Sequence, residues 1–116
     1  MKNNKITGEL GEKFAKEYLK KMGWKILELN WRAGKLAEID IIAKDGGETV
    51  FVEVKTRSSL NFGHPFEAVD RRKLQNIQTA ALTYMQNKKD RFRIDVIGVV
   101  LSEKPEIEHL RGISLD

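Results

Sequence analysis

The fold of this chain is decided by residues 38–57, which read EIDIIAKDGGETVFVEVKTR. Two apolar-rich runs flank the pair Gly46-Gly47, a pattern typical of a β-hairpin. Both runs also carry acids at positions where a half-buried strand should carry apolar side chains. Functional sites are expected where the local pattern and the chemistry conflict, so this hairpin is the first candidate for one.

A hairpin that turns at Gly46-Gly47 has a fixed register, in which the numbers of paired residues sum to a constant. The predicted pairs are Asp45 with Glu48, Ile42 with Phe51, Asp40 with Glu53, and Glu38 with Lys55. Because side chains alternate along a strand, one face is expected to carry Glu38, Asp40, Glu53, Lys55 and Arg57. Opposed carboxylates about 5 Å apart repel each other, so a hard divalent cation such as Mg²⁺ is a natural counter-charge, with Lys55 as a second cation. A β-bulge or a loop of odd length would break this register.

Composition places the chain among soluble globular proteins. It has 116 residues, which predicts one domain over residues 1–116, and its apolar and charged contents are 41% and 33%. The net charge of +4 gives weak support to an anionic partner such as nucleic acid. Cysteine is absent, which excludes disulfides and thiolate metal sites. Without a membrane-length apolar run or a signal-peptide core, the expected location is the cytoplasm, with no membrane partner.

The first helix is predicted over residues 5–22. An apolar stripe recurs every four residues, and its members are Ile6, Leu10, Phe14, Tyr18 and Met22, widened by Ala15 and Leu19. Glu12 lies at the margin of this stripe, directly after Gly11 and one turn after Gly8, and these two glycines permit close approach of another chain or ligand. It can look into a site beside the core, although position alone favours a boundary glutamate with its tip in water.

A first strand is predicted from Trp24 to Trp31, followed by a basic loop over residues 30–35. Arg32 and Lys35 in this loop suit contact with phosphate, although sequence alone favours an ordinary basic loop. Residues 58–65 form a second predicted loop, beside the acids. In it, His64 is more often structural than catalytic.

A second helix is predicted from Pro65 to Asn87, with its buried stripe formed by Leu74, Ile77, Ala81, Tyr84 and Met85. Lys88 and Lys89 would complement the helix dipole at its end. The cluster Arg71-Arg72-Lys73 has no such explanation, and we expect it to reach a nucleic-acid backbone.

The strongest predicted strand runs from Arg91 to Leu101, and its apolar end suggests a strand covered on both faces. Asp95 interrupts it, and we favour a paired structural acid over an outer member of the carboxylate cluster. Residues 106–110 offer a short edge strand. The predicted order is thus αβββαβ with an optional last strand: an α/β fold whose mixed sheet joins an antiparallel hairpin to a parallel strand through the second helix.

These residues resemble the PD-(D/E)xK restriction-endonuclease-like nucleases, and most closely the YraN-type bacterial proteins, a family similar to archaeal Holliday-junction resolvases. The segments that carry the resemblance are residues 8–12, 30–32, 38–42, 51–57, 62–65, 67–69 and 93–97. A bare D…ExK pattern occurs by chance, but the whole set in this order is specific. Ala37 stands where the family normally has glycine, and Ile39 where the superfamily name has proline.

The resemblance implies a restriction-endonuclease-like fold and hydrolysis of a DNA phosphodiester. Asp40 and Glu53 would bind Mg²⁺ or Mn²⁺ with the Val54 carbonyl, and Glu12 would complete the site directly or through water. Lys55 would orient or activate the attacking water or stabilise the pentavalent phosphate. Backbone contacts are expected from Arg32, Lys35, Arg57, Arg71, Arg72 and Lys73. Resolvases of this kind act as symmetric dimers, which suits a branched substrate.

Two other functions use the same fold. One is a nucleic-acid-binding module with a weak or inactive nuclease site. The other is an interaction scaffold whose acids only form ion pairs, such as Glu38 with Lys55 or Glu53 with Arg57. The sequence contains no base-reading motif, so any DNA recognition is expected to be of shape and backbone.

Overall fold

The computed structural model describes residues 4–58 and 70–114, and its elements follow the predicted order. They are α1 (Asn4–Lys21), β1 (Lys25–Ala33), β2 (Ala37–Asp45), β3 (Glu48–Arg57), α2 (Arg71–Tyr84), β4 (Arg91–Val100) and β5 (Glu106–Leu110). The strands lie side by side in the order β1-β2-β3-β4-β5. Only β3 and β4 pair in parallel, so the predicted mixed α/β sheet with a crossover helix is confirmed, including the short last strand.

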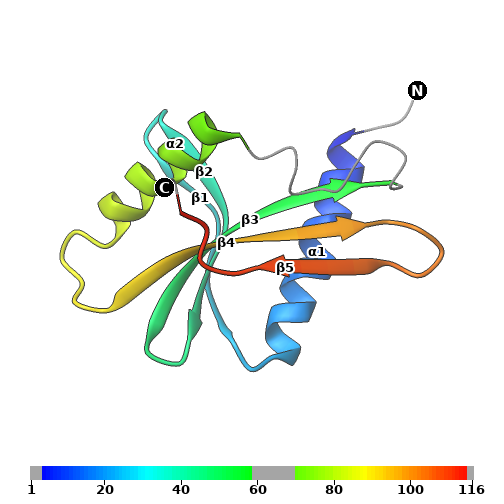
Figure 1. Ribbon diagram of the computed structural model, residues 1–116, viewed down its shortest axis with the longest axis horizontal. Helices are drawn as coiled ribbons and strands as arrows, with labels where there is room; N and C mark the ends of the chain where they lie inside the picture. Colours follow the sequence, from blue (N-terminus) through cyan, green and yellow to red (C-terminus); the bar gives the residue numbers. More distant parts are fainter. Residues whose placement is uncertain (1–3, 59–69, 115–116) are drawn as a thin grey trace.

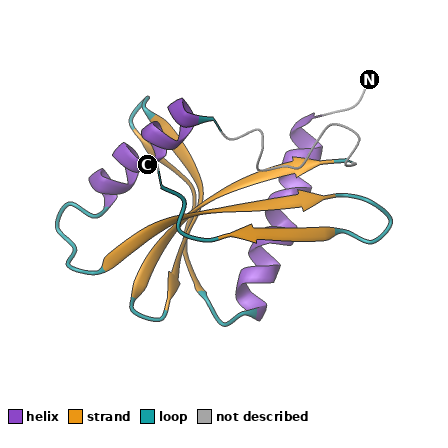
Figure 2. Ribbon diagram, in the orientation of Figure 1, coloured by secondary structure: helices purple, strands orange, loops and turns teal. Residues whose placement is uncertain are grey.

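The two helices cover opposite faces of this twisted sheet (Figures 1 and 2). One core cluster packs α1 against the sheet through Ala15, Leu19 and the β3 residues Val50 and Val52. The other packs α2 against the hairpin strands through Ile77, Ala80, Ala81, Ile39 and Phe51. In Figure 1, β1 and β2 curve away with α2, whereas β3, β4 and β5 extend over α1. The sheet therefore opens between β2 and β3.

The buried face of α1 differs from the predicted stripe. Ile6 and Leu10 are exposed, whereas Ala15 and Leu19 are fully buried. Gly11 is also buried, because the helix approaches β3 so closely that a Cβ at Gly11 would lie 1.9 Å from the Thr56 hydroxyl oxygen. The predicted close approach is thus made at Gly11, and it brings the first half of α1 onto the end of β3.

Two predicted loops and boundaries are corrected. Strand β1 continues to Ala33, so the basic segment around Arg32 is the end of a strand and only the turn at residues 34–36 joins it to β2. Helix α2 begins at Arg71 rather than near Pro65, because Asp70 is its N-cap and accepts a hydrogen bond from the Lys73 N–H. The loop predicted over 58–65, with His64 and Pro65, lies almost wholly outside the described residues.

The end of α2 is also earlier than predicted. The helix stops at Tyr84, and a turn follows. Lys88 nevertheless donates to the Tyr84 carbonyl at 3.2 Å and lies over the Tyr84 ring, so it does satisfy the helix end. Ile77, Ala81 and Met85 are buried as predicted.

The hairpin register is confirmed from the turn up to the pair Ile41–Val52. The ladder stops there, so the two further predicted pairs, Asp40 with Glu53 and Glu38 with Lys55, do not form as ladder pairs. The physical reason is that the Asp40 carboxylate accepts a hydrogen bond from the Val54 N–H at 2.8 Å, where backbone pairing would otherwise continue. A side chain thus separates the two strands.

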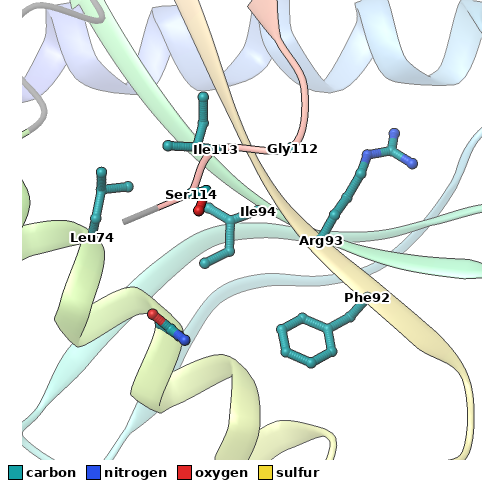
Figure 3. Close-up of a pocket in the computed structure, with 8 residues that line it drawn as sticks. Leu74, Phe92, Arg93, Ile94, Gly112, Ile113 and Ser114 are labelled. Carbon is teal, nitrogen blue, oxygen red and sulfur yellow. The ribbon is translucent and has the colours of Figure 1, made fainter. Parts of the chain in front are cut away.

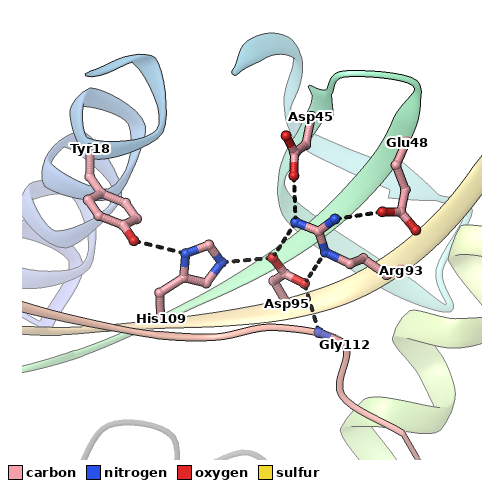
Figure 4. Close-up of polar contacts among 7 residues, drawn as sticks. All are labelled: Tyr18, Asp45, Glu48, Arg93, Asp95, His109 and Gly112. Atoms are coloured by element: carbon pink, nitrogen blue, oxygen red, sulfur yellow. Dashed lines mark hydrogen bonds and ion pairs between the residues drawn. The ribbon is translucent and has the colours of Figure 1, made fainter. Parts of the chain in front are cut away.

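Asp95 is the predicted paired structural acid, and it is fully buried (Figure 4). It accepts hydrogen bonds from Arg93 at 3.0 Å, His109 at 2.7 Å and the Gly112 N–H at 3.0 Å. Arg93 also pairs with Asp45 and Glu48 beside the hairpin turn. This network ties β4 to the C-terminal segment and to the hairpin, away from the predicted catalytic acids.

Neither of the two helices found in residues 4–58 and 70–114 is long and apolar enough to cross a membrane.

Candidate functional site

The candidate site lies where β2 and β3 separate. Asn30 of β1 has a positive φ of 52° and lies between Leu29 and Trp31, whose partners on β2 are Ile41 and Ile39. At the same level the alternation of β2 breaks, because Ile39 and Ile42 both belong to the α2 cluster while Ile41 belongs to the α1 cluster. The strict alternation on which the prediction of a shared face for Asp40 and Glu38 was based is therefore interrupted at Asp40. Instead, Asp40 points into the opening between β2 and β3, toward Val54.

Asp40 and Glu53 come together in this opening. Glu53 is 2% exposed, and it is the only buried glutamate or aspartate besides Asp95 in the described part of the chain. Burial and, after it, the nearby charge of Glu53 together raise the pKa of Asp40 to about 8, although the Val54 hydrogen bond acts in the opposite direction. Two carboxylates forced together in this way attract a proton or a cation.

Two lysines supply that positive charge. The Glu53 Oε2 atom lies 2.7 Å from the Lys73 ammonium and 3.6 Å from the Lys55 ammonium. Burial and the charge of Lys73 lower the pKa of Lys55, although Glu53 opposes this. Burial also acts to lower the pKa of Lys73, but its hydrogen bond and ion pair with Glu53 outweigh burial and raise it. Lys73 is therefore the firmly charged partner, and Lys55 is the more readily deprotonated one.

Glu12 of α1 reaches the same opening from the other face of the sheet. Burial raises the pKa of Glu12, and the charges of Glu38 and Glu53 add to this rise. A hydrogen bond from the Asn30 side chain acts to lower the pKa of Glu12. The irregular backbone at Asn30 therefore accompanies a side chain that contacts Glu12. Glu12 is thus half-buried and electrostatically coupled to the site, rather than a boundary residue with its tip in water.

These groups line one open cavity of about 360 Å³. Its walls are Thr7, Gly8, Glu12, Asp40, Glu53, Val54, Lys55, Thr56, Arg57 and Lys73. All four predicted catalytic residues and Val54 are therefore brought together. A second cavity of about 330 Å³ adjoins it and shares Asp40 and Lys73, with Arg72 and Asn76 on its α2 side.

The donor set suits a hard cation without forming a closed cage. Among residues 4–58 and 70–114, no three acidic or histidine side chains already converge as a metal site. Mg²⁺ characteristically takes one or two carboxylates and completes its shell with water and substrate phosphate. The joined carboxylates of Asp40 and Glu53, with Glu12 in the same cavity, fit that pattern.

The predicted phosphate contacts do not all gather here. Arg57 and Lys73 line the carboxylate cavity, and Arg72 lines the adjoining one. The Arg57 Nε atom is the one buried side-chain N or O atom without a hydrogen-bond partner among the described residues. Arg32 and Lys35 lie outside both cavities, and Arg32 pairs with Glu38 at 3.5 Å.

Sequence reasoning missed the position of Lys73. It was predicted to contact a nucleic-acid backbone, whereas the structure places its ammonium on Glu53. A signal was present, because Arg71, Arg72 and Lys73 occupy the first turn of α2, where positive charge opposes the helix dipole. The partner of that charge could be identified only from the packing of α2 on the hairpin.

A third cavity, of about 350 Å³, lies between α2, β4 and the C-terminal segment (Figure 3). Leu74, Phe92, Ile94 and Ile113 contribute apolar side chains to its walls, Gln78 and Ser114 contribute polar ones, and no acid lines it. The Arg93 side chain extends away from it, toward the Asp95 network. This cavity has no groups suited to the chemistry of the carboxylate site.

Comparison with known proteins places the chain in a family. A family model described as "Uncharacterised protein family UPF0102" matches residues 11–99. A UPF0102 protein of Caldicellulosiruptor saccharolyticus is 45% identical over 108 residues, covering 90% of this chain and 91% of the relative. UPF0102 protein TTE1452 of Caldanaerobacter subterraneus subsp. tengcongensis is 47% identical over 115 residues, covering 96% and 93%. The chain therefore belongs to the UPF0102 family.

Proposed function

We propose that this protein is a metal-dependent DNA endonuclease of the PD-(D/E)xK, restriction-endonuclease-like type, with a YraN-type relationship to Holliday-junction resolvases. One observation carries the proposal. Asp40 and Glu53, from two strands that separate at this level, share a half-enclosed polar cavity with Lys55. The mixed sheet with one helix on each face is compatible with that fold.

Each residue of the cavity then has a chemical role. Asp40 and Glu53 would hold Mg²⁺ or Mn²⁺ with the Val54 carbonyl, and Glu12 would hold a metal-bound water or bind directly. When bound, the ion would polarise the phosphate and lower the pKa of its water. The lowered pKa of Lys55 suits a group that orients or accepts a proton from the attacking water. As the ammonium, Lys55 would instead stabilise charge on the pentavalent phosphate.

The DNA backbone would approach along the cationic side of the opening. Arg57 and Arg72 line the two adjoining cavities and are placed for phosphate contact. Arg71, Arg32 and Lys35 would extend that contact beyond the cavities. Recognition would be of shape and backbone, and a symmetric dimer would suit a branched substrate with two cut sites.

A second candidate is a DNA-binding module that does not cut. The observation that favours it is the Lys73–Glu53 ion pair at 2.7 Å, which neutralises the buried carboxylate with a side chain. The two functions share every phosphate contact and differ only in catalysis. A scaffold without DNA binding is the third candidate, and it requires none of these contacts.

A cleavage panel separates the three. Branched, flapped and linear DNA are incubated with the wild type, Asp40→Asn and Lys55→Ala, in Mg²⁺, in Mn²⁺ and in EDTA. Metal-dependent cutting by the wild type that falls at least a hundredfold in both variants supports the endonuclease. Salt-sensitive binding without cutting supports the binding module. Absence of binding supports the scaffold, and equal cutting by all three proteins identifies a contaminant.

A further inference from the structure

Lys73 of α2 forms an ion pair with Glu53 of β3 across the opening between the strands. Its ammonium lies 2.7 Å from Glu53 Oε2, closer than the 3.6 Å of Lys55, which comes from the same strand as Glu53. The Glu53 side chain is 3% exposed and the Lys73 side chain 45% exposed. A nearly buried carboxylate is therefore neutralised mainly by a lysine whose side chain is about half exposed to solvent.

The position of Lys73 is unfavourable for the helix itself. It is the third residue of α2, after Arg71 and Arg72, and the first turn contains no acid. Cations at a helix N-terminus oppose the dipole, and within the described cap and first turn, residues 70–74, Asp70 is the one acid that offsets them. Helix stability thus gives no reason for a lysine at this position. The need to neutralise the buried Glu53 carboxylate does give one.

We propose that Lys73 is an exchangeable counter-cation, which neutralises Glu53 in the metal-free protein and is displaced from Oε2 by the divalent ion. The proposal rests on the proposed function, because it takes Glu53 as a ligand of that ion. Two cations cannot share one carboxylate oxygen at contact distance without strong repulsion. Lys73 therefore lowers the affinity for the metal when DNA is absent, and this affinity rises when bound DNA draws Lys73 away from Glu53.

The geometry gives the displaced ammonium a destination. Lys73 lines both the carboxylate cavity and the adjoining 330 Å³ cavity, whose polar lining also includes Arg72, Asn76 and the acids Glu38 and Asp70. Because the stem is flexible and half-exposed, the ammonium can turn into the second cavity without movement of α2. A backbone phosphate lying there would receive the lysine as the metal takes Glu53. Metal and DNA would then bind cooperatively. The metal releases Lys73 from Glu53 for contact with phosphate, and the phosphate keeps Lys73 away from the metal ligand Glu53.

The test is the affinity for Mn²⁺ in the absence of DNA, measured by isothermal titration calorimetry at pH 8. Lys73→Gln removes the counter-cation and is expected to bind Mn²⁺ roughly tenfold more tightly than the wild type, because the competing charge is gone. Lys73→Arg keeps the charge and should stay within about twofold of the wild type. Lys89→Gln removes one charge from an exposed position beyond the end of α2, outside both cavities and outside the proposed DNA contacts, so it controls for the change in overall charge and should also stay within about twofold.

A second readout protects against a variant that is only destabilised. In EDTA, Lys73→Gln should melt below the wild type, and saturating Mn²⁺ should raise its melting temperature by more than it raises that of the wild type. Mn²⁺ affinity that is unchanged or weaker in Lys73→Gln overturns the inference, even if the wild type cuts DNA. Absence of Mn²⁺ binding in every protein, Lys73→Gln included, overturns the proposed metal site together with it.

Discussion

The Val54 N–H donates a 2.8 Å hydrogen bond to the Asp40 carboxylate, at the level where β2 and β3 stop pairing. One residue thus both ends the ladder and points a carboxylate into the opening that results. The neighbouring Glu53 is then held beside Asp40 without being its ladder partner. The site depends on this local departure from regular sheet structure.

Asp40→Asn should stabilise the metal-free protein while it removes metal binding. The pKa of Asp40 is raised from 3.8 to about 8. A raised folded-state pKa means that stability is fully present below the unfolded value and is lost as pH rises through the folded value. Asparagine keeps an oxygen for Val54 and cannot ionise, so at pH 9 in EDTA we expect a gain of about 1–3 kcal/mol by urea denaturation, discounted because Asp40 is partly exposed.

At pH 4 the same variant should differ little from the wild type, since Asp40 is then protonated in the folded state. A variant that is less stable than the wild type at pH 9 would show that Asp40 is instead a favourable structural ion. Calorimetric titration with Mn²⁺ on the same samples should detect no binding to the variant.

Gly11→Ala should displace α1 and weaken the site. The new methyl group would lie 1.9 Å from the Thr56 hydroxyl oxygen, so helix and strand must separate. Overpacking of this kind costs about 1–3 kcal/mol, and it moves Glu12, the next residue, away from the cavity. We expect a lower melting temperature and a cleavage rate reduced at least tenfold.

Gly8→Ala is the matched control, because a Cβ at Gly8 meets nothing within 4 Å. Replacing glycine by alanine inside a helix should stabilise the protein by about 0.5–1 kcal/mol. If Gly11→Ala behaved like Gly8→Ala, the close contact between α1 and β3 would be refuted.

The Asp95 network should make stability depend on acid pH. Burial alone would raise the pKa of Asp95, but hydrogen bonds from His109, Arg93 and Gly112 outweigh it and lower the pKa. A lowered pKa gives stability that is present above the unfolded value near 3.8 and is lost as pH falls through the folded value. Melting temperature should therefore drop steeply below about pH 4.

Asp95→Asn tests that assignment. It leaves Arg93 and His109 without their buried acceptor charge and should cost about 3–5 kcal/mol at pH 7. Its remaining acid dependence between pH 4 and pH 2 should be shallower than that of the wild type. Because the network lies away from the carboxylate cavity, cleavage per folded molecule at low temperature should be kept. Loss of cleavage in a fully folded Asp95→Asn sample would place Asp95 in the active site.

Arg72→Gln should change how DNA binding depends on salt. Each lost phosphate contact lowers the slope of log K against log salt by about one, whatever the DNA sequence. Fluorescence anisotropy with labelled duplex between 50 and 200 mM salt measures that slope. Lys20→Gln removes one positive charge at an exposed position near the C-terminal end of α1, outside the proposed DNA contacts, and should leave the slope unchanged. Equal slopes in wild type and Arg72→Gln would exclude Arg72 from the DNA interface.

Local pattern was sufficient for much of the fold. Gly46-Gly47 and the alternation around it predicted the register up to Ile41 and Val52, and the apolar stripe of α2 predicted its buried face. Asp95 was predicted to be a paired structural acid, because a lone acid in a buried strand needs partners.

The rest depends on contacts between distant segments. Strict alternation of side chains could not predict its own interruption at Asp40. This interruption is stabilised by a hydrogen bond from the Val54 N–H, which belongs to a different strand. On α1, hydrophobicity favoured the face with Ile6 and Leu10, but these side chains are exposed. The buried face contains Gly11 instead, because the helix packs closely on Thr56 there. Lys73 reaches Glu53 only because α2 crosses the hairpin, and no local pattern encodes that crossing.

The initial rate of cleavage of a branched DNA substrate in Mn²⁺, compared for the wild type, Glu53→Gln and Lys55→Ala purified side by side, tests the proposed nuclease site. The wild type should cut the substrate, EDTA should abolish cutting, and the rate should fall by at least about a hundredfold in each variant. DNA binding should persist in all three. Wild-type cleavage that is absent, or that survives in both variants, would contradict the claim that these residues form a nuclease site.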